Sequence, residues 1–138
     1  MRILIVSQYF WPENFRVNEI AEFLKKENIE VDILTGNPNY PEGKIFKDFK
    51  ENPVKYNSYK GSKIYRVPIF TRGSGSLVSL FFNYSSFLFS SMTIGFFKLR
   101  KKKYDYILTF GTSPITVALT SLFFSCLLYT SPSPRDGL

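Results

Sequence analysis

The residues of this sequence best suited to bind a ligand follow four short apolar segments. Carboxylate, guanidinium, amide and phenol groups form directional hydrogen bonds with polar ligands. We therefore predict a substrate-binding set that consists of Glu13, Arg16, Asn37, Asn39, Tyr40 and Arg72. The run Gly111, Thr112 and Ser113 would offer backbone N–H groups at a helix N-terminus, so we predict that it binds a phosphate or another anionic oxygen.

Each of these residues also has a structural explanation when it is taken alone. Glu13 could stabilise a helix start, and Ser113 could be a helix N-cap. The pairs Asn37-Pro38 and Tyr40-Pro41 could simply form turns. The argument for a site is that all of these residues fall at one edge of the expected sheet. In open parallel sheets, ligands bind outside the carboxyl ends of the strands.

The apolar segments predict four strands, and helical patterns separate most of them. The strands are Arg2–Val6, Val31–Thr35, Lys63–Pro68 and Tyr104–Phe110. Strands that alternate with helices predict an α/β fold in which a parallel sheet is flanked by helices on right-handed crossovers. Residues 44–62 are polar, and we expect them to leave the sheet without contributing to the core.

The helix boundaries can be predicted from capping residues. Asn14 could cap the first helix, and Asn28 suits the left-handed conformation that follows a helix end. A long apolar helix is expected over Leu77–Phe97, and a last helix begins with Pro114 at its first position.

Composition restricts the class of function. The chain has 138 residues, 44% of them hydrophobic, a net charge of +7, no histidine and one cysteine, Cys126. It contains no GxGxxG motif, no P-loop and no Cys or His cluster. Dinucleotide binding, Walker-type hydrolysis and zinc chemistry therefore have no support. We expect no metal and no cofactor. Because Met1-Arg2-Ile3 opens directly into a strand, we expect no signal peptide.

The segment Leu77–Phe97 allows three interpretations. Its 21 uncharged residues could span a bilayer, and the basic cluster Lys98–Lys103 follows it. A spanning helix would place two strands of one sheet on opposite sides of the membrane, so a buried crossover helix fits better. We favour a surface helix whose aromatic face enters the lipid interface. The predicted membrane-contacting residues are Phe81, Phe82, Phe96, Phe97, Lys98, Arg100, Lys101, Lys102 and Lys103. A solvated helix end is the alternative for the basic cluster.

The segment Cys126–Asp136 differs abruptly from the apolar helix before it. It resembles the translation of a sequencing-library adapter, and an ordinary disordered Pro/Ser tail is the alternative. We therefore interpret residues 126–138 as a non-native tail and residues 1–125 as part of one domain. On this interpretation Cys126 is not native and the protein is a fragment.

Three segments together resemble a known enzyme family. They are Ser7–Glu13, Thr35–Gly43 and Thr109–Pro114, and they resemble the N-terminal domain of a family 4 glycosyltransferase from the group that makes bacterial surface polysaccharides, such as colanic acid and O-antigen fucosamine transferases. The resemblance covers residues 1 to about 125. It implies a Rossmann-like sheet that is the incomplete N-terminal half of a GT-B fold.

The resemblance also implies a reaction. Such enzymes transfer a sugar from a nucleotide-sugar donor to an acceptor, with retention and without a metal. The N-terminal domain receives the acceptor, here a polyprenyl-linked or other saccharide at the cytoplasmic face of the bacterial inner membrane. Trp11-Pro12-Glu13 stands where many relatives have a glycine-rich turn. The donor site lies mainly in a C-terminal domain that this sequence lacks, so we expect no turnover from this chain alone, and the catalytic residues are not assigned.

Two other functions compete with this interpretation. One is a non-enzymatic α/β module that binds a membrane surface through the aromatic helix and the basic cluster. The other is a nucleic-acid binder, which we do not expect, because the basic residues gather at a helix end and do not form a stripe with interleaved aromatic residues.

Overall fold

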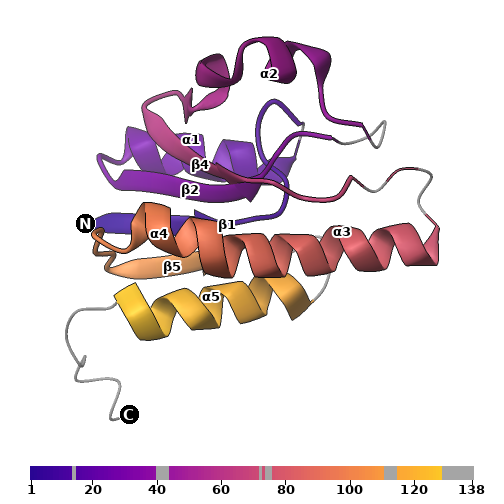
Figure 1. The fold of residues 1–138 in the computed structure, drawn as a ribbon. Helices are drawn as coiled ribbons and strands as arrows, with labels where there is room; N and C mark the ends of the chain where they lie inside the picture. Colours follow the sequence, from indigo (N-terminus) through magenta and orange to yellow (C-terminus); the bar gives the residue numbers. More distant parts are fainter. Residues whose placement is uncertain (14, 40–43, 72, 74–75, 111–114, 129–138) are drawn as a thin grey trace.

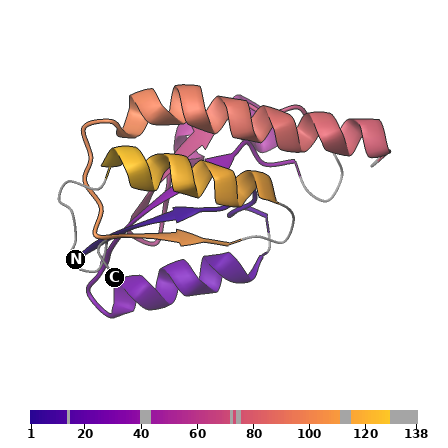
Figure 2. The same ribbon diagram turned by 90° about the horizontal axis from the view of Figure 1, so that it is seen from below.

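Figures 1 and 2 show the computed structural model, a five-stranded sheet flanked by helices; it describes residues 1–13, 15–39, 44–71, 73, 76–110 and 115–128. Strands β1 (Arg2–Val6), β2 (Glu30–Gly36), β4 (Ser62–Val67) and β5 (Tyr106–Thr109) are parallel in the order β4-β2-β1-β5. The two-residue strand β3 (Ser58–Tyr59) pairs antiparallel with β4 at the sheet edge. The predicted α/β class is confirmed, but the sheet is not wholly parallel.

The helices cover the two faces of the sheet unequally. Helix α1 (Arg16–Lys26) lies on one face, whereas α3 (Leu77–Ser90), its extension and α5 (Ile115–Leu128) lie on the other (Figure 2). The chain therefore leaves β1 toward one face and β5 toward the other. This reversal of direction between neighbouring strands is where ligands bind in many open α/β sheets.

Helix α1 confirms one predicted boundary and corrects the other. Asn28 has a φ of 63°, the left-handed conformation expected after a helix end, and its backbone N–H donates to the carbonyl of Lys25. At the other end the helix begins at Arg16, with Phe15 at the N-cap position and no side-chain cap. The predicted cap, Asn14, lies outside the described residues.

The apolar crossover helix runs continuously over Leu77–Leu99. Its first part is α3, which Ser76 caps by accepting a hydrogen bond from the backbone N–H of Ser79 at 3.2 Å. A π-helical turn, η2 (Ser91–Gly95), follows, and α4 (Phe96–Leu99) completes the helix. The helix is long and apolar enough to cross a membrane by length and composition alone.

The connection between β2 and β4 contains more structure than we predicted. It forms the short helix α2 (Lys47–Glu51), a 3-10 turn η1 (Pro53–Tyr56) and β3. Tyr56 is buried, and its ring lies 5.1 Å from that of Trp11. The expectation that residues 44–62 stay out of the core is therefore wrong. Aromatic side chains attach this polar segment to the loop after β1.

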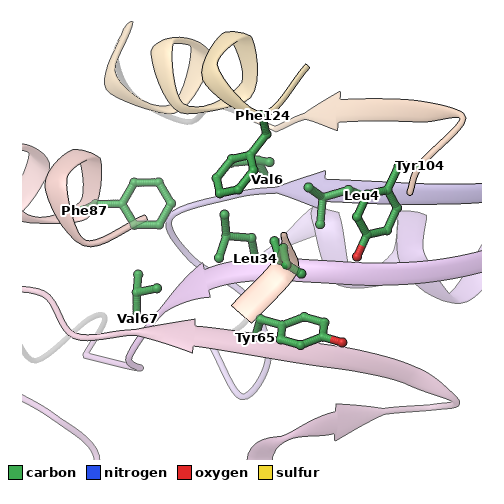
Figure 3. Close-up of a cluster of buried hydrophobic side chains, with 9 residues drawn as sticks. Leu4, Val6, Leu34, Tyr65, Val67, Phe87, Tyr104 and Phe124 are labelled. Atoms are coloured by element: carbon green, nitrogen blue, oxygen red, sulfur yellow. The ribbon is translucent and has the colours of Figure 1, made fainter. Parts of the chain in front are cut away.

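Alternation along the strands divides the core into two layers. On the α1 face, Ile3, Ile5 and Ile33 pack against Val17 and Ala21 of the helix. On the opposite face, strand side chains meet the apolar helices (Figure 3). This second layer contains Leu4, Val6, Leu34, Tyr65, Val67, Phe87, Leu99, Tyr104 and Phe124.

Helix α5 extends past the predicted domain boundary at residue 125. It continues through Cys126 to Leu128, and residues 129–138 lie outside the described part of the chain.

Candidate functional site

The loops at the carboxyl ends of β1 and β2 are joined through a buried carboxylate. Glu13 is 1% exposed, and its Oε2 accepts a hydrogen bond from the backbone N–H of Asn39 at 3.0 Å. Its Oε1 accepts a longer one from Phe10 N at 3.4 Å, and its carbonyl accepts from Asn18 Nδ2. Glu13 therefore holds two loops together from within.

Arg66, near the end of β4, supplies the positive charge beside this carboxylate. Its Nε donates to the carbonyl of Tyr56 at 3.1 Å, and Nη1 donates to that of Gly36 at 3.1 Å. Nη2 donates to the carbonyl of Trp11. Burial lowers the pKa of Arg66 to about 10, and the nearby Glu13 carboxylate and Tyr56 phenol oppose this shift. The guanidinium thus remains charged at neutral pH and ties together the loop after β1, the end of β2 and the 44–62 connection.

A second buried polar cluster connects the loop after β1 to α3. Gln8 Nε2 donates to Asn83 Oδ1 at 2.5 Å, and Tyr9 donates its hydroxyl to the same oxygen at 3.4 Å. Asn83 Nδ2 in turn donates to the carbonyl of Phe70 at 2.6 Å. Asn83 is fully buried on an otherwise apolar helix, so this amide fixes where α3 lies relative to the sheet edge.

Three buried amide oxygens at this edge have no hydrogen-bond partner within the described residues. They are Oε1 of Gln8, Oδ1 of Asn39 and Oδ1 of Asn18, the residue whose amide N–H donates to Glu13. Because unpaired buried acceptors are costly, such atoms often accept a hydrogen bond from a ligand or an ordered water. Hydroxyl and N–H groups, which a saccharide carries in quantity, have the matching polarity.

The structure brings only part of the predicted substrate-binding set together. Glu13 and Asn39 are hydrogen-bonded to each other, and the half-buried Asn37 accepts from Asn39 Nδ2 through its carbonyl. Arg16 is exposed at the first position of α1 and joins none of these hydrogen bonds. The remaining predicted residues lie outside the described residues; they are Tyr40, Arg72, Gly111, Thr112 and Ser113.

The predicted membrane-contacting residues divide into two groups. Phe81, Phe82 and Phe97 are exposed, as are Arg100, Lys101 and Lys103. The other group faces the protein to differing degrees. Phe96 is half-buried against the core, and the exposed Lys98 donates its ammonium to the carbonyl of Arg66 at 2.8 Å. Lys102 is half-buried, and its backbone N–H donates to the carbonyl of Leu99.

Sequence reasoning missed Gln8, Arg66 and Asn83. Arg66 was expected only as a member of the strand Lys63–Pro68, and Asn83 only as a polar residue of the apolar helix Leu77–Phe97. Asn83 falls four residues before Phe87 and on the same helical face, but only the structure shows that this face is buried.

No group of three or more His, Cys, Asp or Glu side chains within the described residues could hold a metal ion. No protein-family model and no curated protein matches the chain.

Replacement of Asn83 should loosen α3 from the sheet edge. In Asn83→Ala the side-chain amide of Gln8 and the carbonyl of Phe70 lose their partner, so we expect a loss of about 1–3 kcal/mol in the free energy of unfolding. Urea unfolding followed by fluorescence of Trp11, the only tryptophan, measures this loss. The control is Ser85→Ala, a half-buried position two residues further along the helix. Equal stabilities of the two variants would contradict the assigned role of Asn83.

Proposed function

We propose that this chain is the acceptor-side domain of a retaining, metal-independent glycosyltransferase. The observation that carries the proposal is the polar network at the carboxyl ends of β1, β2 and β4, where amide oxygens of Gln8 and Asn39 have no partner among the described residues. The resemblance of Ser7–Glu13, Thr35–Gly43 and Thr109–Pro114 to bacterial surface-polysaccharide transferases supports the same assignment.

The finer fold assignment belongs to this proposal. The parallel order β4-β2-β1-β5, with helices leaving on opposite faces between β1 and β5, is compatible with a Rossmann-like half of a GT-B enzyme. In such an enzyme a second domain would supply most donor contacts. We infer that the bound acceptor is a saccharide, lipid-linked through a diphosphate, and that the donor is a nucleotide-sugar at the cytoplasmic face of the bacterial inner membrane.

The chemistry of this half would be binding and positioning. Both side chains are buried and hydrogen-bonded to loop backbone, so Glu13 and Arg66 keep the loops rigid before a ligand arrives, which lowers the entropy that binding must remove. The amide groups of Gln8, Asn37 and Asn39 would accept or donate hydrogen bonds to acceptor hydroxyls. Stabilisation of the leaving diphosphate needs fixed donors from both domains, so we expect no turnover from this chain.

Acceptor binding by the 138-residue chain tests the proposal. We expect a short-prenyl diphosphate N-acetylglucosamine to shift the backbone amide NMR signals of Gln8, Asn37 and Asn39, whereas a nucleotide-sugar alone should shift them weakly. Asn37→Ala removes a half-buried side-chain amide and should weaken acceptor binding about threefold to tenfold. The matched control is Asn57→Ala, an exposed asparagine in the turn before β3.

Two results would overturn the proposal. One is the absence of any shift in these three amides at about 1 mM acceptor, which corresponds to less than about 4 kcal/mol of binding free energy. The other is sugar transfer by the purified chain, because that would show that the reaction needs no second domain.

A further inference from the structure

We propose that the helix Leu77–Leu99 lies in the plane of an anionic lipid surface, with its outer aromatic side chains in the interfacial layer. The basic residues that follow the helix would contact the lipid headgroups. This inference adds a partner to the proposed function but rests on different residues, so either can fail without the other.

The helix carries exposed apolar side chains near its start, its middle and its end, and these are here called the outer stripe. It consists of Leu77, Val78, Phe81, Phe82, Phe89 and Phe97. Phe81 is 66% exposed, Phe89 67% and Phe97 67%. Isolated exposed apolar residues are normal on a protein surface, but a line of large aromatic ones along one helix face indicates a partner.

The π-helical turn η2 brings Phe97 into this stripe. One extra residue in a turn rotates everything after it by about 100° around the helix axis. In an uninterrupted α-helix, Leu99 would fall on the side of Phe81, and Phe97 would leave the stripe. With the turn, Leu99 is fully buried in the core and Phe97 is exposed. The same turn places Gly95 where an added Cβ would lie 3.1 Å from Leu34 Cδ1, so the helix packs tightly on the sheet there.

The positive charge of residues 52–104 indicates an anionic partner. Residues 52–104 contain ten lysines and arginines and no aspartate or glutamate. Arg100 lies with its guanidinium 5.7 Å from the centre of the Phe97 ring, and Lys101 and Lys103 are exposed beside it. Aromatic rings followed by clustered cations are typical of helices that bind in the interface of anionic membranes. A second copy on the same face would bring like charges together, so we do not favour a dimer.

The opposite face of the helix excludes a spanning orientation. Asn83, Phe87 and Ser91 are buried against the sheet or α5 over successive turns. A helix that crossed the bilayer would have to give up these contacts and carry part of the sheet into the hydrocarbon. Binding in the plane keeps the contacts and exposes only the outer stripe to lipid.

This orientation would bring the membrane beside the candidate site. The amino-terminal end of α3 extends beyond the carboxyl ends of the strands (Figures 1 and 2). There Phe70, whose carbonyl accepts from Asn83, lies 6.0 Å from the ring of Phe82. The basic cluster is at the other end of the helix, about 33 Å away. The outer stripe would therefore bring the loops after β1 and β2 close to the headgroup layer.

Vesicle flotation tests the proposal. We expect the chain to bind vesicles of phosphatidylcholine with one quarter phosphatidylglycerol, and to bind pure phosphatidylcholine at least about tenfold more weakly. Raising the salt to about 0.5 M should weaken binding to the anionic vesicles several-fold, because it screens the headgroup attraction. Equal binding to both vesicle types, or none to either, would overturn the proposal.

Two matched pairs of variants identify the surface responsible. Phe81→Ser with Phe89→Ser should reduce partitioning at least about tenfold, whereas Phe23→Ser, an exposed phenylalanine on α1, should leave it unchanged. Lys101→Glu with Lys103→Glu should reduce it at least about tenfold, whereas Lys47→Glu with Lys50→Glu on α2 should change it less. Equal losses in the phenylalanine comparison would show that the outer stripe is not the binding surface, and equal losses in the lysine comparison would show that the basic cluster is not; either result overturns the proposal.

Depth measurements separate the in-plane orientation from the alternatives. Tryptophan placed singly by Phe81→Trp, Phe89→Trp and Phe97→Trp should be quenched by brominated lipids at one common shallow depth, after subtraction of the Trp11 signal. A much deeper Trp at position 89 would indicate a spanning helix. A stable dimer in solution, with no quenching at the three positions, would identify a second copy as the partner. Either of these two results overturns the proposal.

Discussion

Arg66→Met should be among the most destabilising single substitutions in this chain. It leaves the buried Glu13 carboxylate without its neighbouring positive charge and removes the donor for the carbonyls of Trp11, Gly36 and Tyr56. We expect a loss of about 3–5 kcal/mol in the free energy of unfolding, because three carbonyls lose their donor and Glu13 loses a nearby positive charge. Equilibrium unfolding in urea, followed by Trp11 fluorescence, measures this loss directly.

The control is Lys63→Met on the same strand. Lys63 is exposed, so its replacement should cost within about 0.5 kcal/mol. Arg66→Lys should also cost more than the control, because one ammonium cannot reproduce the three divergent N–H bonds of the guanidinium. A stability of Arg66→Met within about 1 kcal/mol of the wild type would show that the loops do not depend on this residue.

A double substitution distinguishes the contribution of the Arg66 charge to stability from that of its hydrogen bonds. Glu13→Gln with Arg66→Met removes both charges, so the double variant should lose less than the sum of the two single losses, by about 0.5–3 kcal/mol. Additive losses would indicate that the carbonyl contacts of Arg66, and not its charge beside Glu13, hold the loops.

The sheet was predictable because its strands have regular apolar patterns. Arg2–Val6 matches β1 in full, and the expected strand near Val31–Thr35 lies within β2. The 44–62 connection was not predictable in the same way, since its buried contribution comes from single tyrosines. Tyr56 and Tyr59 pack against Trp11 from a distance of more than 40 residues along the chain, and no local pattern carries that information.

The candidate site was predictable in place but not in detail. Glu13 and Asn39 each follow a strand, and parallel strands end at one edge of the sheet. The sequence therefore correctly predicted that these two residues lie together. The same reasoning could not tell a side chain that binds a ligand from one that binds the loops. Arg66 and Asn83 act from within a strand and a helix, where their polarity looked like ordinary surface variation, so only the packing of distant elements reveals them.

The long helix shows why a constant helical period does not predict which residues are buried. Its sequence predicted a surface helix with Phe81, Phe82, Phe96 and Phe97 facing outward, but Phe96 packs against the core after η2 interrupts the helical period. Counting at constant spacing from Leu77 misplaces everything after Ser91, including Phe97 and Leu99.

Phe87→Ala should cost about 3–5 kcal/mol in the free energy of unfolding, comparable to the loss in Arg66→Met. Phe87 is 0% exposed and packs in the layer with Val6, Leu34 and Phe124 (Figure 3), where its removal leaves a cavity between α3 and the sheet. Phe87→Leu retains most of the volume and should cost less, so that the direction of the effect stays measurable if the alanine variant does not fold.

The matched control for Phe87 is Phe89→Ala, on the same helix two residues further on. Phe89 belongs to the outer stripe, so its removal should cost within about 0.5 kcal/mol and leave the urea transition almost unchanged. Its loss should instead appear as weaker binding to anionic vesicles, which Phe87→Leu should retain. The two side chains therefore separate the two roles of one helix: the inner face holds the sheet, and the outer face binds lipid. If Phe89→Ala destabilised the fold as much as Phe87→Ala, the outer stripe would be part of the core and the lipid proposal would lose its surface.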